Sequence, residues 1–369
     1  MRERENKMFS KDKNTLNRVV VLIPSLDPDG MLGKYVSGLK EAGFQKIVIV
    51  NDGSKIDNLE FFPEEKDGVT ILKHAVNQGK GRALKTGFHH VLNVYSSDEI
   101  AGVVTADADG QHSVEDTVKV AKELVKEKSF VLGTRDFNEE HVPFKSRNGN
   151  KITTNVFHLL FGKRIHDTQT GLRGIPYEYL KKCLTLKGER FEYEINMLID
   201  AVRSDLKISE VLIQTIYFDS NRATHFSAVK DSARIYGVIF GEFIRFSISG
   251  LASAAIDVGV FAILTKLIFR GLSVTSATFA GTLIARVVSS LFNYSMNKQI
   301  FQSEGSVKKS MMKYYILCAC QLVASWLLVV LVFNHIQWDT TLIKVIIDTC
   351  LFFISYQIQR RWVFREVAK

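Results

Sequence analysis

The sequence is poor in cysteine and proline, and these shortages exclude several classes of protein. Four cysteines in 369 residues are too few for a disulfide scaffold, and their scattered spacing is not typical of a zinc site. Five prolines and 24 glycines exclude collagen-like and low-complexity chains. Hydrophobic residues make up 46% of the chain, which is too many for an intrinsically disordered protein. A chain of this length is expected to form two or three domains, at roughly 150 residues each.

The start of the sequence lacks an apolar stretch. Residues 1–17 are largely charged and polar, so we interpret them as a solvated tail and not as a signal peptide. The domain that follows is accordingly expected in the cytoplasm.

The last third of the sequence has a different composition. All prolines lie at or before Pro176, and long apolar runs begin near residue 243. Residues 314–333 carry no charge, and a helix of that length, at about 1.5 Å per residue, crosses a hydrocarbon core of roughly 30 Å. Three similar runs hold one or two charged residues each. The sequence therefore predicts an all-α transmembrane domain at residues 246–364, with four spans at about 246–268, 274–296, 314–335 and 341–359.

Basic residues gather beside these predicted spans. They precede the first span, fill the loop between the second and third, and follow the fourth: Lys230, Arg234, Lys298, Lys308, Lys309, Lys313, Arg360, Arg361, Arg365 and Lys369. Because positive loops stay on the cytoplasmic side, we expect both termini and the loop at 301–313 in the cytoplasm, in a multi-pass protein of the cell's inner or plasma membrane. This accounts for the net charge of +9 without a nucleic-acid partner, and none is expected.

The remainder of the sequence alternates strand-like and helix-like segments. Short β-branched runs occur at 18–24, 46–50, 69–72, 100–105 and 130–132, and helical patterns occupy 79–94 and 113–128. Such alternation predicts a doubly wound, mostly parallel α/β sheet. Ligands bind such sheets beyond the carboxyl ends of the strands, so the residues at those ends are the candidate site.

Acidic residues follow the first, second and fourth predicted strands. Asp27 and Asp29 follow the first, Asp52 follows the second, and Asp107 and Asp109 follow the fourth. Two carboxylates two residues apart suit a hard divalent cation, Mg²⁺ or Mn²⁺, that also bridges to substrate phosphates. A solvated turn is the alternative for the pair after the fourth strand.

Residues 77–83 (NQGKGRA) open a predicted helix. Its glycines and Lys80 suit an anion at a positive helix end. The segment does not match a phosphate-binding GxxxxGK[ST] loop or a GxGxxG fingerprint. Phosphate contact and plain helix capping both remain open for it.

Taken in order, these motifs resemble a known family. IPSLDPDG, VNDGS, NQGKGRALKTGF, DADGQH, GTR, HDTQTGLRG and NRATHF follow the order and spacing of family 2 glycosyltransferases of the polyprenyl-phosphate type, the dolichyl-phosphate mannose synthase-like enzymes. The apolar tail, whose second and fourth spans both end in a basic residue, a spacer, an aliphatic residue and Phe, resembles a GtrA-like domain. The resemblance implies a GT-A domain at 18–226, an interfacial helix or linker at 227–245 and the membrane domain at 246–364.

The resemblance also implies roles for individual residues. Asp107, Asp109 and Gln111 would hold the metal. The donor would be bound by Pro24, Ser25, Asp27, Asp29, Asp52, Lys80 and Asp107. The acceptor phosphate would be bound by Arg135, Arg147 and Arg222, and the catalytic set would be Asp109, Arg135, Asp167 and Arg222. Two positions depart from the family: Asp27-Pro28 stands where Asn-Glu is usual, so that Asp29 is expected to replace the Glu, and Asn51 replaces the first Asp of a pair.

The expected activity is that of an inverting, membrane-bound glycosyltransferase. It would move one sugar from a UDP- or GDP-linked donor to a polyprenyl phosphate (undecaprenyl phosphate if the source is bacterial) for modification of cell-envelope glycans. A phosphate acceptor is already anionic near pH 7 and needs no strong base, so His112 is interpreted as structural, as are Glu192 and Glu194. The sequence does not decide between a monomer and a homo-oligomer.

Two other functions stay open at this point. The first is a processive polysaccharide synthase, although the only near match to its QxxRW motif, at 357–362, has the wrong spacing. The second is a lipid-sugar flippase, for which charges within the spans would be candidates because they are costly in a membrane. These charges are Asp257, Arg286, Lys344 and Asp348, and pairing among themselves is the simpler explanation for them.

Overall fold

The computed structural model describes residues 14–139, 142, 144–214, 230–301, 303 and 305–364. The chain divides into two compact units, Met1–Ile239 and Phe240–Lys369. Each unit is described by itself below.

The first unit is built on a sheet of seven strands in the order β3-β2-β1-β4-β6-β5-β7. The strands are β1 (Val19–Ser25), β2 (Ile47–Asn51), β3 (Val69–Lys73), β4 (Gly102–Thr105), β5 (Phe130–Arg135), β6 (Arg173–Pro176) and β7 (Ile208–Ile213). Only β6 runs antiparallel to its neighbours, β4 and β5, and the other pairs are parallel. The predicted mostly parallel sheet is therefore confirmed.

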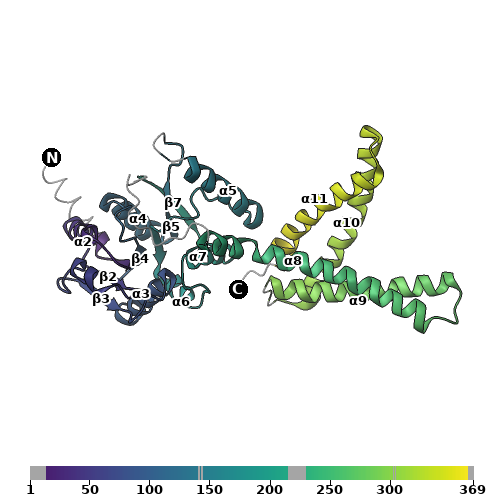
Figure 1. Cartoon of the computed structure of the whole chain (residues 1–369), viewed down its shortest axis with the longest axis horizontal. Coiled ribbons are helices and arrows are strands. Elements are labelled where there is room, and N and C mark those ends of the chain that lie inside the picture. Colours follow the sequence, from purple (N-terminus) through teal and green to yellow (C-terminus); the bar gives the residue numbers. More distant parts are fainter. Residues whose placement is uncertain are drawn as a thin grey trace. The chain divides into compact units, whose positions relative to one another are not determined.

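Helices cover both faces of this sheet, as Figure 1 shows. They are α2 (Gly30–Ala42), α3 (Lys80–Val94), α4 (Val114–Glu127), α5 (Phe144–Phe161), α6 (Tyr177–Cys183) and α7 (Glu192–Arg203), with a short 3₁₀ helix η1 (Ile56–Phe61). Side chains of α2 and α4 pack on alternate residues of β1, such as Val21 and Ile23. On the other face α3 comes so close that a Cβ at Gly87 would lie 2.2 Å from Cδ1 of Leu22. This alternation of buried residues is what a two-sided sheet requires.

Local caps explain where two of these helices begin. Asp29 accepts a hydrogen bond from the Met31 amide and starts α2, and Ser113 accepts one from the Asp116 amide and starts α4. Both are preferred residues at that position because a side-chain oxygen satisfies an amide that the helix leaves unpaired. The amides that directly precede α3 are bound by a residue from elsewhere in the chain, which belongs to the site described below.

The second unit contains four long apolar helices. α8 (Lys230–Ile263) continues into a π-helical turn, η2 (Leu264–Ile268), and is followed by α9 (Val274–Ile300), α10 (Val307–Ile336) and α11 (Thr340–Ile358), which ends in a second π-helical turn, η3 (Gln359–Val363). Four helices in the described part of the chain are long and apolar enough to cross a membrane, as predicted. Residues 230–245 of the segment expected as an interfacial helix or linker, 227–245, form the start of α8.

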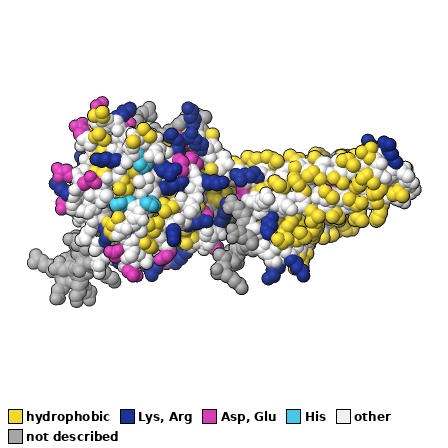
Figure 2. All heavy atoms as spheres, turned by 90° about the horizontal axis from the view of Figure 1, so that it is seen from below, with side chains coloured by type: hydrophobic (Ala, Val, Ile, Leu, Met, Phe, Trp, Pro, Cys, Tyr) yellow, Lys and Arg dark blue, Asp and Glu magenta, His cyan; other side chains and the backbone are white. Residues whose placement is uncertain are grey.

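Hydrophobic side chains lie on the outside of this second unit (Figure 2). Leu251 is 73% exposed and Trp326 is 65% exposed, which suits lipid and not water as the surrounding solvent. Aromatic rings pack inside. Phe301 stacks on Phe364 with ring centroids 5.5 Å apart, so the two similar segments that end the second and fourth spans meet at their final residues.

Candidate active site

The carboxyl ends of β1, β2 and β4 bring together the residues that the sequence singled out. Asp107, just after β4, is paired with Lys80 at the start of α3, with 2.6 Å between Oδ1 and Nζ. The same ammonium lies 3.0 Å from Oε2 of Glu194 on α7. His112 approaches the other oxygen of Asp107, with Nε2 3.4 Å from Oδ2. One carboxylate of the predicted metal pair is thus surrounded by cationic and imidazole nitrogens.

Burial and charge act against each other in this cluster. Burial favours the neutral forms of Lys80 and Asp107, but the charged neighbours of each together outweigh it. Asp107 and Glu194 raise the pKa of Lys80, and Lys80 and His112 lower the pKa of Asp107. Burial and the neighbouring Asp107 carboxylate both raise the pKa of Asp109. The Asp109 carboxylate accepts a hydrogen bond from the Gln111 amide at 3.1 Å. Asp109 is therefore the carboxylate of this cluster whose negative charge is least stabilised.

A loop at residues 166–173 closes against Asp107. Gly171 is essential there, because a Cβ at this position would lie 2.2 Å from Oδ2 of Asp107. The Thr105 hydroxyl at the end of β4 also donates to the Gly171 carbonyl at 2.9 Å. The loop is held by Arg173, which is 1% exposed and donates to the carbonyls of Thr170 at 2.8 Å and Glu194 at 2.5 Å. Its packing against the segment that follows β4 is therefore close and fixed.

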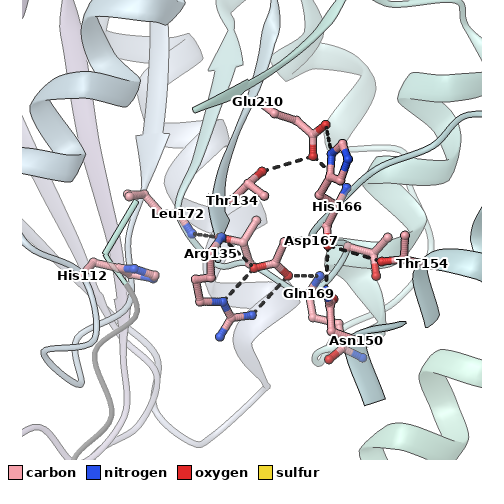
Figure 3. Close-up of polar contacts among 12 residues, drawn as sticks. His112, Thr134, Arg135, Asn150, Thr154, His166, Asp167, Gln169, Leu172 and Glu210 are labelled. Carbon is pink, nitrogen blue, oxygen red and sulfur yellow. Dashed lines mark hydrogen bonds and ion pairs between the residues drawn. The ribbon is translucent and has the colours of Figure 1, made fainter. Parts of the chain in front are cut away.

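Asp167, near the start of this loop, binds Arg135 at the end of β5. Asp167 is fully buried and accepts from Nε of Arg135 at 2.7 Å and from Nη2 at 3.2 Å. Figure 3 shows this fork together with the backbone amide of Gln169, which donates to the same carboxylate. Such a bidentate pair fixes the plane of the guanidinium. Asp167 and Arg135, both predicted site residues, thus form one unit.

A second layer supports the Arg135–Asp167 pair. Glu210 on β7 accepts from the His166 amide at 2.8 Å, contacts the His166 ring at 2.9 Å and accepts from the Thr134 hydroxyl at 3.2 Å. The His166 carbonyl accepts from the Asn150 side chain on α5 at 2.7 Å. These contacts (Figure 3) join β5, β7 and α5 around the loop.

The residues predicted to contact the nucleoside are linked to one another. Asp52 is 3% exposed, and its carboxylate accepts from the amides of Gln78 at 2.9 Å and Gly79 at 2.7 Å and contacts the His74 ring at 2.7 Å. It therefore holds the two amides that directly precede α3, while the phosphate contact considered for 77–83 stays a prediction.

The β1 loop is connected to the β2 loop. Asp27 has a left-handed backbone, with φ of 45°, and its carboxylate accepts from the Lys55 amide at 2.8 Å. Its own amide donates to the Ser54 hydroxyl at 2.8 Å. Ser25 and Pro24 end β1, and Ser25 pairs with Asn51 across the sheet. The donor roles predicted for these residues stay predictions.

Both parts of the chain are similar to known protein families. Residues 21–184 match the family described as glycosyl transferase family 2. An uncharacterized protein of Methanocaldococcus jannaschii is 35% identical over 58% of this chain and 88% of its own length. The chain belongs to glycosyl transferase family 2. Residues 245–364 match the GtrA/DPMS transmembrane domain, so this glycosyltransferase is a membrane protein.

Relatives of named activity resemble the same part of the chain. The UDP-N-acetylglucosamine--dolichyl-phosphate N-acetylglucosaminyltransferase of Methanococcus voltae is 30% identical over 56% of this chain and 88% of its own length. The dolichyl-phosphate beta-glucosyltransferase of Saccharomyces cerevisiae is 29% identical over 55% of this chain and 68% of its own length. Among solved structures, glucosyl-3-phosphoglycerate synthase of Mycobacterium tuberculosis, in complex with Mn²⁺, UDP-glucose and phosphoglyceric acid, has a TM-score of 0.49 and 14% identity, and it covers 63% of this chain and 82% of that one.

Two predicted residues of the glycosyltransferase unit remain to be placed. Arg147 lies on α5, and its Nη2 donates to the Glu139 carbonyl at 2.9 Å, while its buried Nε has no hydrogen-bond partner among the described residues. Arg222 lies outside the described residues. Asp29, suggested as a substitute donor contact, caps α2.

Two residues of the site were not predicted from the sequence. Glu194 was interpreted as structural, but its carboxylate holds Lys80. Arg173 is part of the motif HDTQTGLRG, for which no role at this position was predicted, and it anchors the loop at 166–173 to α7 through the Glu194 carbonyl. The signal available for both was their charge within apolar surroundings, RFEYEINML and GLRGIP, since a charged residue in a buried segment needs a partner.

Proposed function

We propose that this glycosyltransferase moves one sugar from a nucleotide-sugar donor to a polyprenyl phosphate, with inversion at the anomeric carbon, at the cytoplasmic face of the membrane. The proposal rests mainly on two contacts of the loop at 166–173. Gly171 lies against Asp107, which suits the donor's diphosphate site, and Asp167 holds Arg135, which suits a phosphate acceptor. The dolichyl-phosphate transferases among the relatives and the GtrA/DPMS match support a lipid acceptor.

Asp107, Asp109 and Gln111 are the residues proposed to hold Mg²⁺ or Mn²⁺. Two observations fit a cation there: an ammonium already occupies Oδ1 of Asp107, and burial together with the like charge of Asp107 raises the pKa of Asp109. The described residues contain no cluster of three or more His, Cys, Asp or Glu that would hold a metal alone. This suits a site completed by donor phosphates and water. When bound, the ion would take up charge on the departing diphosphate.

The reaction follows from the chemistry of the acceptor. A phosphate oxygen attacks the anomeric carbon, a new carbon–oxygen bond forms, and the bond to the donor diphosphate breaks with its electron pair. No proton has to be removed from a phosphate acceptor at neutral pH, so no general base is required. Arg135 and Arg147 are proposed to bind the acceptor phosphate, and Arg222 is proposed to join them from outside the described residues. Asp167 would keep Arg135 in one orientation.

The donor end of the site is proposed to lie at the β1 and β2 loops. Pro24, Ser25, Asp27 and Asp52 would contact or position the nucleoside, and Lys80 would face the diphosphate at the start of α3. A UDP- or GDP-linked sugar fits this proposal, and the name of the Methanococcus relative favours UDP.

The two rival functions are less well supported. The segment resembling QxxRW belongs to the membrane unit, where Gln359 accepts from the Asn297 side chain and Arg360 pairs with Glu242. The charges in the spans also have local partners: Arg286 with Asp257 at 3.3 Å, and Lys344 with Asp348 at 2.8 Å. A processive synthase would need the QxxRW-like segment at the acceptor site. A flippase would use the charges within the spans.

A panel of labelled nucleotide sugars tests the proposal. The full-length protein in membranes is incubated with each donor and a polyprenyl phosphate, and the extracted lipid is analysed by mass spectrometry. One sugar per lipid phosphate, released by mild acid, is expected. A ladder of sugars on one lipid would identify a polymerase instead. Lipid-linked sugar that crosses vesicle bilayers with no transfer in any donor reaction would favour the flippase.

A further inference from the structure

Lys80 connects two carboxylates that come from distant parts of the glycosyltransferase unit. Asp107 follows β4 and Glu194 opens α7, and the Lys80 ammonium lies 2.6 Å from the first and 3.0 Å from the second. The side chains of Lys80 and Glu194 are 14% and 8% exposed. Water therefore screens these attractions only weakly.

Lys80 occupies an oxygen that the proposed metal site needs. Oδ1 of Asp107 is the atom in contact with the ammonium, and a divalent cation on the same carboxylate would repel that ammonium. Any cation that enters must therefore displace Lys80 from Asp107 or bind beside an unfavourable charge.

Glu194 offers the displaced ammonium another partner. One of its oxygens already contacts Lys80, while the other, Oε1, is buried and has no hydrogen-bond partner among the described residues. Burying an unpaired carboxylate oxygen is costly. A small movement of Lys80 from Asp107 towards Glu194 would satisfy that oxygen.

We propose that Lys80 is a built-in competitor of the divalent cation for Asp107, and that Glu194 receives its ammonium when the cation binds. The proposal rests on the metal-dependent transfer argued above and extends it. It makes cation and donor binding cooperative, because Lys80 becomes available to the donor diphosphate only after it has left Asp107. Lys80 and Glu194 thereby act as positioning residues for the metal.

Binding of Mn²⁺ alone tests this without any turnover. The full-length protein in detergent is titrated with Mn²⁺, and free Mn²⁺ is measured by electron paramagnetic resonance, with and without UDP. Lys80→Met should bind Mn²⁺ roughly tenfold more tightly than the wild type without UDP, because a charge-assisted contact no longer competes. Glu194→Gln should bind roughly tenfold more weakly, because Lys80 then has only Asp107 as an anionic partner.

Lys85→Met is the matched control. Lys85 lies on the same helix but contacts Glu189 at 3.0 Å and the Gly188 carbonyl at 2.9 Å, so Mn²⁺ affinity should not change. UDP should tighten Mn²⁺ binding in the wild type and have a smaller effect in Lys80→Met. Lys80→Gln replaces Lys80→Met if thermal unfolding shows that the latter is misfolded.

The outcomes separate this proposal from the proposed function. Equal or weaker Mn²⁺ binding by the folded Lys80 variants, with wild-type binding abolished by Asp109→Asn, would overturn the competitor role alone. A wild type whose Mn²⁺ binding is unaffected by Asp109→Asn would instead overturn the metal assignment.

Discussion

The two units place apolar and charged side chains in opposite ways. In the sheet unit, aliphatic residues such as Val21 and Leu124 form a buried core. In the membrane unit, residues such as Leu251 and Trp326 face outward. The interior of that unit holds polar groups as well as aromatic rings: Asn297 is fully buried and donates to Gln359 at 3.0 Å. A lipid environment explains the reversal, since burial of apolar groups brings no gain there and unpaired polar groups cost more.

Charge is distributed differently as well. The sheet unit concentrates opposite charges around one loop, where Lys80, Arg135 and Arg173 meet Asp107 and Asp167 or nearby carbonyls. The membrane unit keeps its charges in separate pairs, such as Arg360 with Glu242. Concentrated charge is typical of a site built to act on charged substrates, whereas isolated pairs mainly remove the cost of charge in a membrane.

The first prediction tests the membrane topology expected for the unit with the outward apolar surface. In a variant without native cysteines, a cysteine at Ser306 should resist an impermeant thiol reagent in sealed cells, and a cysteine at Gln337 should react, because the basic loops are expected inside. This difference should be nearly all-or-none, measured by mass shift on a gel. Permeabilised cells are the control, in which both positions should react. The reverse pattern in sealed cells would invert the topology.

The second prediction tests the concentrated charge. EDTA should abolish transfer, and Mg²⁺ or Mn²⁺ should restore it, because the departing diphosphate would otherwise carry uncompensated charge. Asp109→Asn should lose about 10² to 10³-fold in kcat, the range found when a group that stabilises transition-state charge is removed. Thermal unfolding checks that the variant is folded. Full activity in EDTA would argue against the metal site.

The third prediction concerns Arg173, whose partners are backbone carbonyls. Arg173→Met should lower the free energy of unfolding of the sheet unit by about 3–5 kcal/mol, since several buried carbonyls lose their donor. Arg164→Met, at an exposed position, should change it by less than about 0.5 kcal/mol. Chemical denaturation of the purified chain measures both. A stable Arg173→Met variant would mean that the loop at 166–173 is held by its other contacts.

The fourth prediction compares a buried arginine paired with a side chain, in the membrane unit, with one bound to backbone carbonyls, in the sheet unit. Arg360→Met should destabilise the membrane unit by about 3 kcal/mol, because the buried Glu242 carboxylate loses the guanidinium that balances its charge. Adding Glu242→Gln should recover much of that loss, since both charges are then gone. Arg173→Met has no such rescue, because a carbonyl cannot be replaced. Thermal unfolding in detergent, followed by tryptophan fluorescence, gives the comparison, and a double variant no better than the single one would contradict it.

Features with a local signal were the ones that the sequence could predict. The strand at 69–72 and the helix at 113–128 were recognised from their apolar patterns, and they match β3 and α4 closely. The strand β6, which contains Gly174 and ends at Pro176, has no such pattern and was missed. It is held in the sheet by its two neighbouring strands, which is information carried by tertiary contacts and not by local sequence.

The residues of the candidate site also differ in whether a local pattern predicts them. Asp107 and Asp109 lie two residues apart at a strand end, so their pattern is visible in the sequence. Glu194 reaches Lys80 only because α7 packs on α3, and no local pattern reports that contact. Asp52 was correctly placed at a strand end, but its contacts with the amides that directly precede α3 depend on the path of the loop at 74–79.

The last prediction has the smallest expected effect. It tests whether Arg135 binds the acceptor phosphate or only supports the structure of the site. Arg135→Lys keeps the charge but loses the fork that Asp167 holds. If Arg135 binds the acceptor phosphate, the KM for the lipid should rise roughly tenfold, the equivalent of one charge-assisted contact, while the KM for the nucleotide sugar changes little. Asp167→Asn should shift the same constant in the same direction, because the guanidinium loses its fixed orientation. Equal changes in both KM values would mean that Arg135 supports the site as a whole. In that case the charged residues around Arg135 would mainly stabilise the fold, as the ion pairs of the membrane unit do. Only Asp107 and Asp109, the proposed metal ligands, would then distinguish the charges of the sheet unit from those of the membrane unit.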